Sequence, residues 1–199
     1  MADIDETITD ALEKARDSRL HTAIAALVAL AATLMALNNV KDGNIVQAMQ
    51  QAQAQGVDDW AYYQAKGTKQ NLAISAREHI ELMRDTTPNV TPEIRAVFEK
   101  RIAEYTDQDR KYEAEKEEIR RRAENDQKRY DELNVHDDQF DMAEALLSVA
   151  IALFGVTALT RKRWLLGVAI VFAACGTILS LGGFFGWNLH PDWLARMLG

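Results

Sequence analysis

Cysteine, histidine, proline and serine are all scarce in this chain, and each shortage excludes a kind of site. The one cysteine in 199 residues, Cys175, has no partner for an intramolecular disulfide, and it lies in an apolar run, where cysteine packs as a small apolar residue. The four histidines are far apart, and the sequence has no Gly-rich phosphate loop, no Cys or His pair at metal spacing and no nucleophile elbow. We therefore expect no enzymatic activity, no cofactor and no metal.

Charged residues are abundant but confined to the middle of the chain. The net charge is −7, and 22 of the 30 acidic and 16 of the 23 basic residues lie between Asn39 and Asp141. Lysines and arginines alternate with acids there, which leaves no basic face for nucleic acid. A charge-rich middle between charge-poor ends is typical of a membrane protein with one extramembrane domain.

Three apolar runs are long enough to cross a bilayer, which needs about 20 residues per helix. The predicted spans are residues 19–40, 142–160 and 164–186. The first run has a cleaved signal peptide as its alternative. However, the preceding segment, residues 1–18, is long and acidic rather than short and basic, which favours an uncleaved anchor.

The basic turn Arg161, Lys162 and Arg163 sets the predicted orientation. Lysine and arginine resist translocation, so a basic turn between two spans indicates a cytoplasmic loop. Residues 1–18 then form an acidic cytoplasmic segment, residues 41–141 a periplasmic domain, and the turn 161–163 is cytoplasmic. The predicted location is the inner (cytoplasmic) membrane.

The middle domain, residues 41–141, is predicted to be a helical hairpin. Thr86 to Pro92 is the clearest turn, with Thr91 as N-cap and Pro92 as first helical residue, and the arms on its two sides are equally long. A helix stop and restart is expected at Gly56 to Asp59.

Apolar residues in the second arm recur every seven positions, at Phe98, Tyr105, Tyr112 and Ile119, which predicts a coiled-coil seam. The alternative is a single solvated helix stabilised by ion pairs such as Glu117–Arg121. The predicted fold class is an all-α membrane protein: three transmembrane helices with a long antiparallel hairpin, a coiled-coil-like stalk, inserted between the first and second.

Small residues mark candidate helix contacts, because they let backbones approach closely within a membrane. In the first span they form one stripe, opposite a leucine face (Leu27, Leu30, Leu34, Leu37) that is expected to meet lipid. The candidate packing residues are Ala25, Ala29, Ala32, Ala36, Gly176, Ser180, Gly182 and Gly186. Residues 187–199 are predicted to form a short amphipathic helix in the interface.

An acidic cluster stands at the outer end of the second span: Asp137, Asp138, Asp141 and Glu144. Three of these share one helical face, and in a symmetric oligomer they would form carboxylate rings that attract cations, as at channel entrances. A carboxylate such as Glu144 near the hydrocarbon is costly and suggests function. The alternative is a water-exposed boundary whose acids only mark the edge of the span.

Three stretches together carry a family resemblance: Asp59 to Lys66 (Asp-Trp-Ala-Tyr-Tyr-Gln-Ala-Lys), the charged helix Lys111 to Arg122, and Leu159 to Trp164. With them the chain resembles an uncharacterised bacterial membrane protein family, domain of unknown function 4337, from the first span to the end of the third. The resemblance implies a three-span membrane protein and supplies no activity or catalytic residues.

Two functional hypotheses follow. The first is a non-enzymatic scaffold or accessory subunit that associates with itself or with a larger membrane complex, through small-residue spans and the stalk. The second is an oligomeric cation channel with the acidic cluster as its outer vestibule. The expected partners are the lipid bilayer and either further copies of the chain or a larger membrane protein complex.

Overall fold

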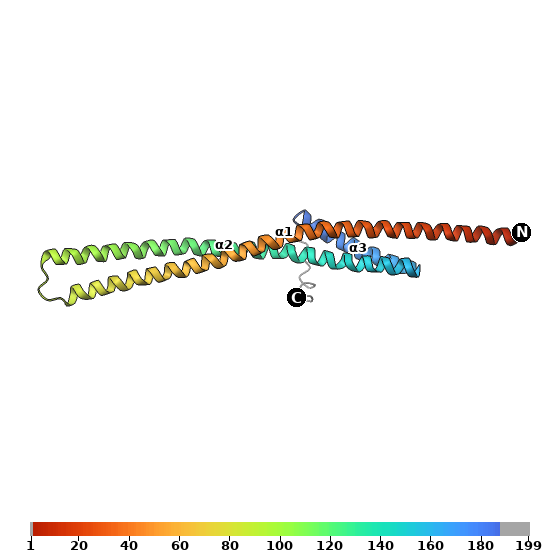
Figure 1. Ribbon diagram of the computed structural model, residues 1–199. Coiled ribbons are helices and arrows are strands. Elements are labelled where there is room, and N and C mark those ends of the chain that lie inside the picture. The colour runs from red at the N-terminus through yellow and green to blue at the C-terminus, as the bar shows by residue number, and fades with distance from the viewer. Residues whose placement is uncertain (1, 188–199) are drawn as a thin grey trace. The chain divides into compact units, whose positions relative to one another are not determined.

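The protein is built from three helices (Figure 1). The computed structural model describes residues 2–187, with side chains from Arg16 onward. Helix α1 spans Ala2–Thr86 (85 residues), α2 spans Pro92–Thr160 (69 residues) and α3 spans Arg163–Phe184 (22 residues). No strand occurs among the described residues, so the prediction of an all-α chain is confirmed. The predicted amphipathic helix at 187–199 lies, beyond Trp187, outside the described residues.

Each of the three helices contains a stretch long and apolar enough to cross a membrane. These stretches share a second property: many of their large apolar side chains are exposed within the chain. Leu30 is 69% exposed, Leu159 87% and Val171 60%. Soluble proteins rarely expose apolar surface of this extent, so such helices need an apolar environment around them.

The two connections between helices are short and locally capped. After Thr86 the chain passes Asn89, whose φ is 56°, and α2 begins at Pro92 as predicted. There the Thr91 hydroxyl accepts a hydrogen bond from the amide of Ile94 at 3.4 Å, which satisfies one of the free amides of the first turn. Arg161 follows α2 with a φ of 56°, and its amide donates to the Thr157 carbonyl at 2.8 Å.

Helix α1 continues without a break through Gly56, so the stop and restart predicted at Gly56 to Asp59 is wrong. A glycine inside a helix costs only about 1 kcal/mol relative to alanine, and the flanking Gln and Ala residues are good helix formers. A Cβ atom placed at Gly56 would lie 3.8 Å from the Cβ of Asp126 on α2, an ordinary packing distance. Gly56 therefore sits on the face that packs against α2.

The helices contribute to two compact units. The apolar unit contains the residues up to Ala48 and those from Glu132 onward, and the charged unit is Met49–Asp131. All three helices supply the core of the apolar unit: Ile24 from α1, Ala150 and Phe154 from α2, and Ala169 from α3 are buried together. Leu27 packs against this core and Leu34 is also half-buried, so only Leu30 and Leu37 of the predicted lipid-facing leucines are exposed.

Two of the four leucines do not face outward as predicted, because α1 packs against both α2 and α3 and therefore buries a broad face. In the apolar unit, the buried positions of α1 are Ile24, Ala31, Asn38 and Ile45, seven residues apart, and Leu27 and Val28 flank this face. The contact face of α1 is therefore wider than a single row, and half of the leucine face falls inside it.

In the charged unit, four ion pairs join α1 to α2. From one pair to the next, the residue number increases along α1 and decreases along α2. The pairs are Asp59–Arg122 at 3.8 Å, Lys66–Glu115 at 2.5 Å, Arg77–Asp109 at 3.5 Å and Arg84–Glu99 at 3.1 Å. This order means that the two segments run antiparallel.

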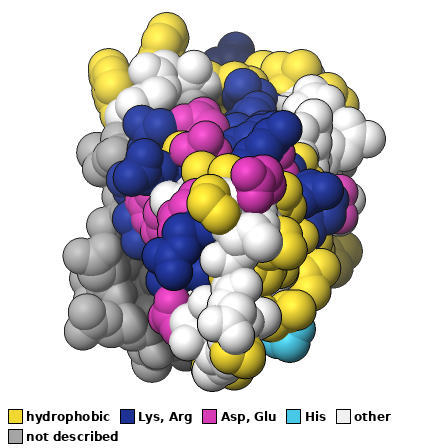
Figure 2. Space-filling view, turned by 90° about the vertical axis from the view of Figure 1, so that its left-hand side faces the viewer, with side chains coloured by type: hydrophobic (Ala, Val, Ile, Leu, Met, Phe, Trp, Pro, Cys, Tyr) yellow, Lys and Arg dark blue, Asp and Glu magenta, His cyan; other side chains and the backbone are white. Residues whose placement is uncertain are grey.

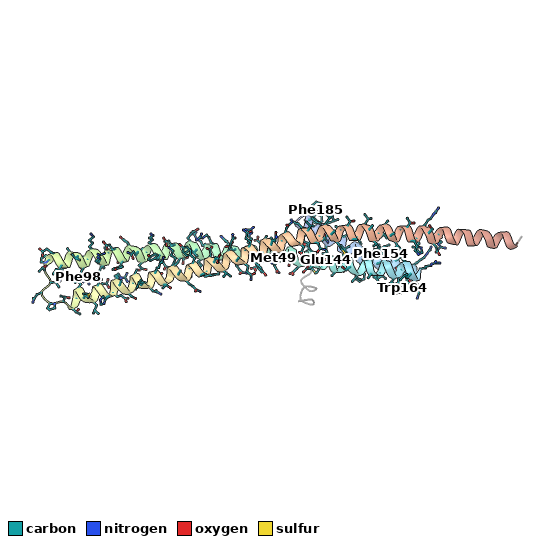
Figure 3. All side chains as sticks on the ribbon, viewed as in Figure 1. Met49, Phe98, Glu144, Phe154, Trp164 and Phe185 are labelled. Atoms are coloured by element: carbon teal, nitrogen blue, oxygen red, sulfur yellow. The ribbon has the colours of Figure 1, made fainter. Side chains whose placement is uncertain are left out.

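The apolar contact between these segments is narrow. Ile119 and Ala123 of α2 are buried with Ala52 and Ala73 of α1, and Phe98, Tyr105 and Tyr112 are half-buried. Phe98 lies near the connection between α1 and α2 (Figure 3). The residues predicted as a seam thus all lie on the less exposed side of α2.

Close approach of α2 and α3 depends on glycine. A Cβ atom at Gly176 would lie 2.9 Å from Leu147 Cγ and 3.0 Å from the Ala143 carbonyl oxygen. We expect Gly176→Ala to destabilise the protein by about 1–3 kcal/mol, because backbone and branched side chain must both shift. Gly167→Ala is the matched control: nothing lies within 4 Å of its Cβ position, so it should be neutral or stabilising by up to about 1 kcal/mol. Unfolding of the two variants in detergent measures this difference, and equal stability would contradict the packing.

Candidate functional site

The predicted acidic cluster lies at the end of the apolar unit where α3 finishes. Glu144 lies toward the Phe185 end of α3, whereas Trp164 lies at the opposite end (Figure 3). The described structure places polar side chains from all three helices at this level. It adds four residues that the sequence analysis did not single out: Asn38, Asn39, Asp42 and Gln139.

A buried hydrogen-bond chain links α1 to α3 at this level. The Asn38 amide nitrogen donates to the Ser180 hydroxyl at 2.7 Å, and the Ser180 hydroxyl donates to the Gly176 carbonyl at 2.8 Å. Asn38 is 1% exposed and Ser180 is fully buried. Because an unpaired polar group in an apolar surrounding costs several kcal/mol, this pairing fixes which faces of α1 and α3 meet.

Gln139 makes the corresponding link from α2 to α3. Its side-chain nitrogen donates to the Leu179 carbonyl at 3.0 Å, and the side chain is fully buried. The side-chain oxygens of Asn38 and Gln139 are buried without a partner. We call Asn38, Gln139 and Ser180 the polar layer.

Glu144, the carboxylate nearest the apolar core, is held by α1. The Asn39 side-chain nitrogen donates to Glu144 Oε1 at 3.2 Å and lies 3.3 Å from the Met35 carbonyl. An amide donor from the neighbouring helix lowers the cost of placing a carboxylate here. The position of Glu144 is therefore accounted for by contacts within one chain.

Asp137 meets a second carboxyl group from α1, that of Asp42. Burial is the main reason that the pKa of Asp137 rises to about 6, and the hydrogen bond to Asp42 and its charge raise it further. Burial also raises the pKa of Asp42, while the hydrogen bond from Asp137 opposes that rise. The two carboxyl groups therefore titrate as a pair that shares a proton, and the raised pKa belongs to the pair.

The remaining members of the predicted cluster differ in their surroundings. Asp141 is largely exposed. Its pKa is nevertheless raised, first by partial desolvation of the carboxylate and then by the negative charges of Asp137, Asp138 and Glu144. Asp138 accepts a hydrogen bond from the Asn134 side chain at 3.3 Å. Two of the four predicted vestibule carboxylates thus contact α1 instead of facing away from the chain, which does not favour carboxylate rings.

Metal binding finds no support in this cluster. Within the described part of the chain, no three His, Cys, Asp or Glu side chains are arranged to hold a metal ion. What the arrangement can do chemically is bind a proton between Asp42 and Asp137.

The predicted packing residues divide into two groups. Gly176, Ser180 and Gly182 are buried against the rest of the apolar unit, whereas Gly186 is exposed and has a φ of 70°, which ends α3 in a conformation that favours glycine. The alanine stripe is exposed along its whole length within the single chain: Ala25, Ala29, Ala32 and Ala36.

The predicted topology determinants are all exposed. Arg161, Lys162 and Arg163 lie between α2 and α3, and Arg161 forms an ion pair with Asp17 of α1 at 2.6 Å.

Of the polar layer, the sequence analysis named only Ser180, as a small packing residue, because it did not consider side-chain amides as helix contacts. Asn38 was visible as an amide at the end of a run of 16 apolar or small residues, Thr22 to Leu37, and Asp42 lies one turn further along the same helix face. Gln139 carried no signal, because it sits among charged residues before the second span.

Acidification should stabilise this protein through Asp137. A carboxyl group whose pKa is raised on folding stabilises the folded state fully below its unfolded pKa, near 3.9, and this stability is lost as the pH rises through about 6. We therefore expect the apparent Tm in detergent to fall between pH 4 and pH 6, and Asp137→Asn to reduce that fall. Asp107→Asn removes a carboxylate from the charged unit and is the control. An unchanged pH dependence in Asp137→Asn would contradict the shared proton.

The Asn38–Ser180 hydrogen bond should be measurable as a coupling energy. In a double-mutant cycle with Asn38→Ala and Ser180→Ala, we expect a coupling of roughly 1 kcal/mol, typical of hydrogen bonds between helices in membranes. The same cycle with Asn39→Ala in place of Asn38→Ala should be additive, because Asn39 bonds to Glu144. Coupling in the Asn39 cycle but not the Asn38 cycle would contradict this geometry.

Comparison with known proteins gives one match. No curated protein and no solved structure matches the chain. A family model described as a domain of unknown function (DUF4337) matches residues 20–186, which includes the three apolar stretches, the charged unit and the polar layer. The resemblance noted from the sequence is confirmed, and the chain belongs to the DUF4337 family.

Proposed function

We propose that this protein is a non-enzymatic integral membrane protein that associates with itself, as a scaffold or as an accessory subunit of a larger membrane complex. The observation that carries the proposal is the alanine stripe of α1. All four of its alanines are exposed within the chain, although the opposite part of the helix is packed on α2 and α3.

The membrane placement behind this proposal has three spans, residues 19–40, 142–160 and 164–186, in a bacterial inner membrane. It is supported by the exposed apolar side chains on all three helices, such as Leu30, Leu159 and Val171. The basic turn at 161–163 supports a cytoplasmic position for that end, and residues 41–141 are then periplasmic.

The alanine stripe is suited to a second helix and poorly suited to lipid alone. In a membrane, helix association depends on close van der Waals packing, and small residues permit it. Around α1 at 100° per residue, the stripe lies about 130° from the buried face centred on Ala31, so a partner helix would not compete with α2 or α3. A second copy of α1 presents the same small residues and meets this requirement in a symmetric dimer.

The charged unit offers a second surface for the larger complex. Its antiparallel segments would form the stalk-like hairpin outside the membrane. Near the connection between α1 and α2, large apolar side chains are exposed, among them Leu82, Met83, Ile94 and Val97. Figure 2 views this side and shows hydrophobic side chains among Lys, Arg, Asp and Glu. A mixed surface of this kind is typical of transient protein contacts.

Cysteine cross-linking in native membranes tests self-association. In a Cys175→Ser background, Ala29→Cys should form a disulfide-linked dimer under mild oxidation, because the two stripes would bring equivalent positions together. Leu30→Cys is the matched control at nearly the same depth, 100° away around the helix. Equal cross-linking at both positions, or none at Ala29, would contradict an interface on the alanine stripe.

A further inference from the structure

A cavity of about 210 Å³ lies in the apolar unit where α2 passes to α3. Its lining comes from two parts of the chain: Arg16, Asp17 and Leu20 of α1, and Arg161 and Arg163 of the turn and the start of α3. Three guanidinium groups therefore border one small volume, with one carboxylate among them.

One of the three arginines at the cavity, Arg161, is paired with a described carboxylate. Asp17 pairs with Arg161 at 2.6 Å, and among the side chains that the structure describes neither Arg16 nor Arg163 forms an ion pair. Within the part of the chain whose side chains are described, the guanidinium groups of Arg16 and Arg163 are thus available to an external anion. A guanidinium binds phosphate oxygens in a bidentate manner.

The backbone at Arg161 is also unusual. Its φ of 56° lies in the left-handed region, where the residue after a helix is most often glycine. An arginine is conformationally disfavoured there because its Cβ atom crowds the backbone. The ion pair with Asp17 holds the Arg161 guanidinium beside the cavity. Arg161 thus places a charged side chain at a position where the backbone conformation alone would favour glycine.

The cavity combines this charge with apolar surroundings. Leu20 forms part of its lining, and Trp164, which follows Arg163, is 66% exposed. Exposed tryptophan at the end of an apolar helix is typical of the headgroup level of a bilayer. A free soluble phosphate would contact only the arginines, whereas a phospholipid would also place its acyl chains against the apolar side chains nearby.

We propose that this cavity binds the phosphate of an anionic phospholipid. Arg16 and Arg163 contact the phosphate oxygens, Arg161 is oriented by Asp17, and the acyl chains lie along the apolar surface beside Leu20. Basic pockets between spans on the cytoplasmic side are suited to such headgroups. The proposal rests on the membrane placement given above and is independent of self-association.

Native mass spectrometry of the full-length protein, titrated in detergent, measures this binding. The probes are dioctanoyl phosphatidylglycerol, the zwitterionic dioctanoyl phosphatidylcholine, and inorganic phosphate. We expect phosphatidylglycerol to bind more tightly than phosphatidylcholine. Arg16→Gln with Arg163→Gln should weaken its binding by about 25-fold, at about fivefold per arginine.

The matched control is Arg19→Gln with Lys162→Gln. It removes the same charge from neighbouring positions that do not line the cavity, and its affinity for phosphatidylglycerol should stay near that of the unaltered protein. Equal weakening in both pairs would overturn the proposal in favour of diffuse attraction, and so would equal binding of the two lipids. Displacement of phosphatidylglycerol by inorganic phosphate at the same concentration would assign a soluble phosphate instead. If the cavity pair fails to fold, Arg163→Gln alone should still weaken binding about fivefold.

Discussion

Side-chain donors enclosed by apolar helices must find acceptors within the protein, and this constraint governs the apolar unit. Asn38 meets Ser180, Gln139 meets the Leu179 carbonyl, and Asn39 meets Glu144. Each contact joins a different pair of helices, so together they fix the rotation of all three. Apolar packing alone would leave that rotation weakly specified, because lipid and leucine are equally apolar. The close approach at Gly176 and Gly183 then follows, since Phe140 and Leu147 fill the space beside them.

The same layer determines what lies on the outside. With the Ile24–Ala31–Asn38 face of α1 turned inward, the alanine stripe and part of the leucine face are left exposed. At the opposite end of the apolar unit, Arg161 and Asp17 join the turn to α1 and border the basic cavity. Self-association is therefore proposed for a surface that the inward face of α1 leaves free, and lipid binding for the cavity beside the contact of Asp17 with Arg161.

Much of the architecture was predictable from local sequence signals, whereas the site was not. The three apolar runs, the turn ending in Thr91–Pro92 and the repeat of Phe98, Tyr105, Tyr112 and Ile119 depend on residues close together in the chain. The predicted helix end at Gly56 was wrong because a glycine permits a helix end without requiring one. Packing against α2 keeps α1 helical through this position. The Asp42–Asp137 contact joins residues 95 positions apart, so its shared proton depends on the packing of α1 on α2 and not on either helix alone.

The proposed contact of the exposed alanine stripe with other proteins is the central claim to test. The most direct test is the mass of the particles that the full-length protein forms in nanodiscs cut from its native membrane. The account predicts at least two copies of the chain, or a copy with a co-purifying membrane partner, in most particles. A single copy without any partner, at every lipid-to-protein ratio, would contradict it.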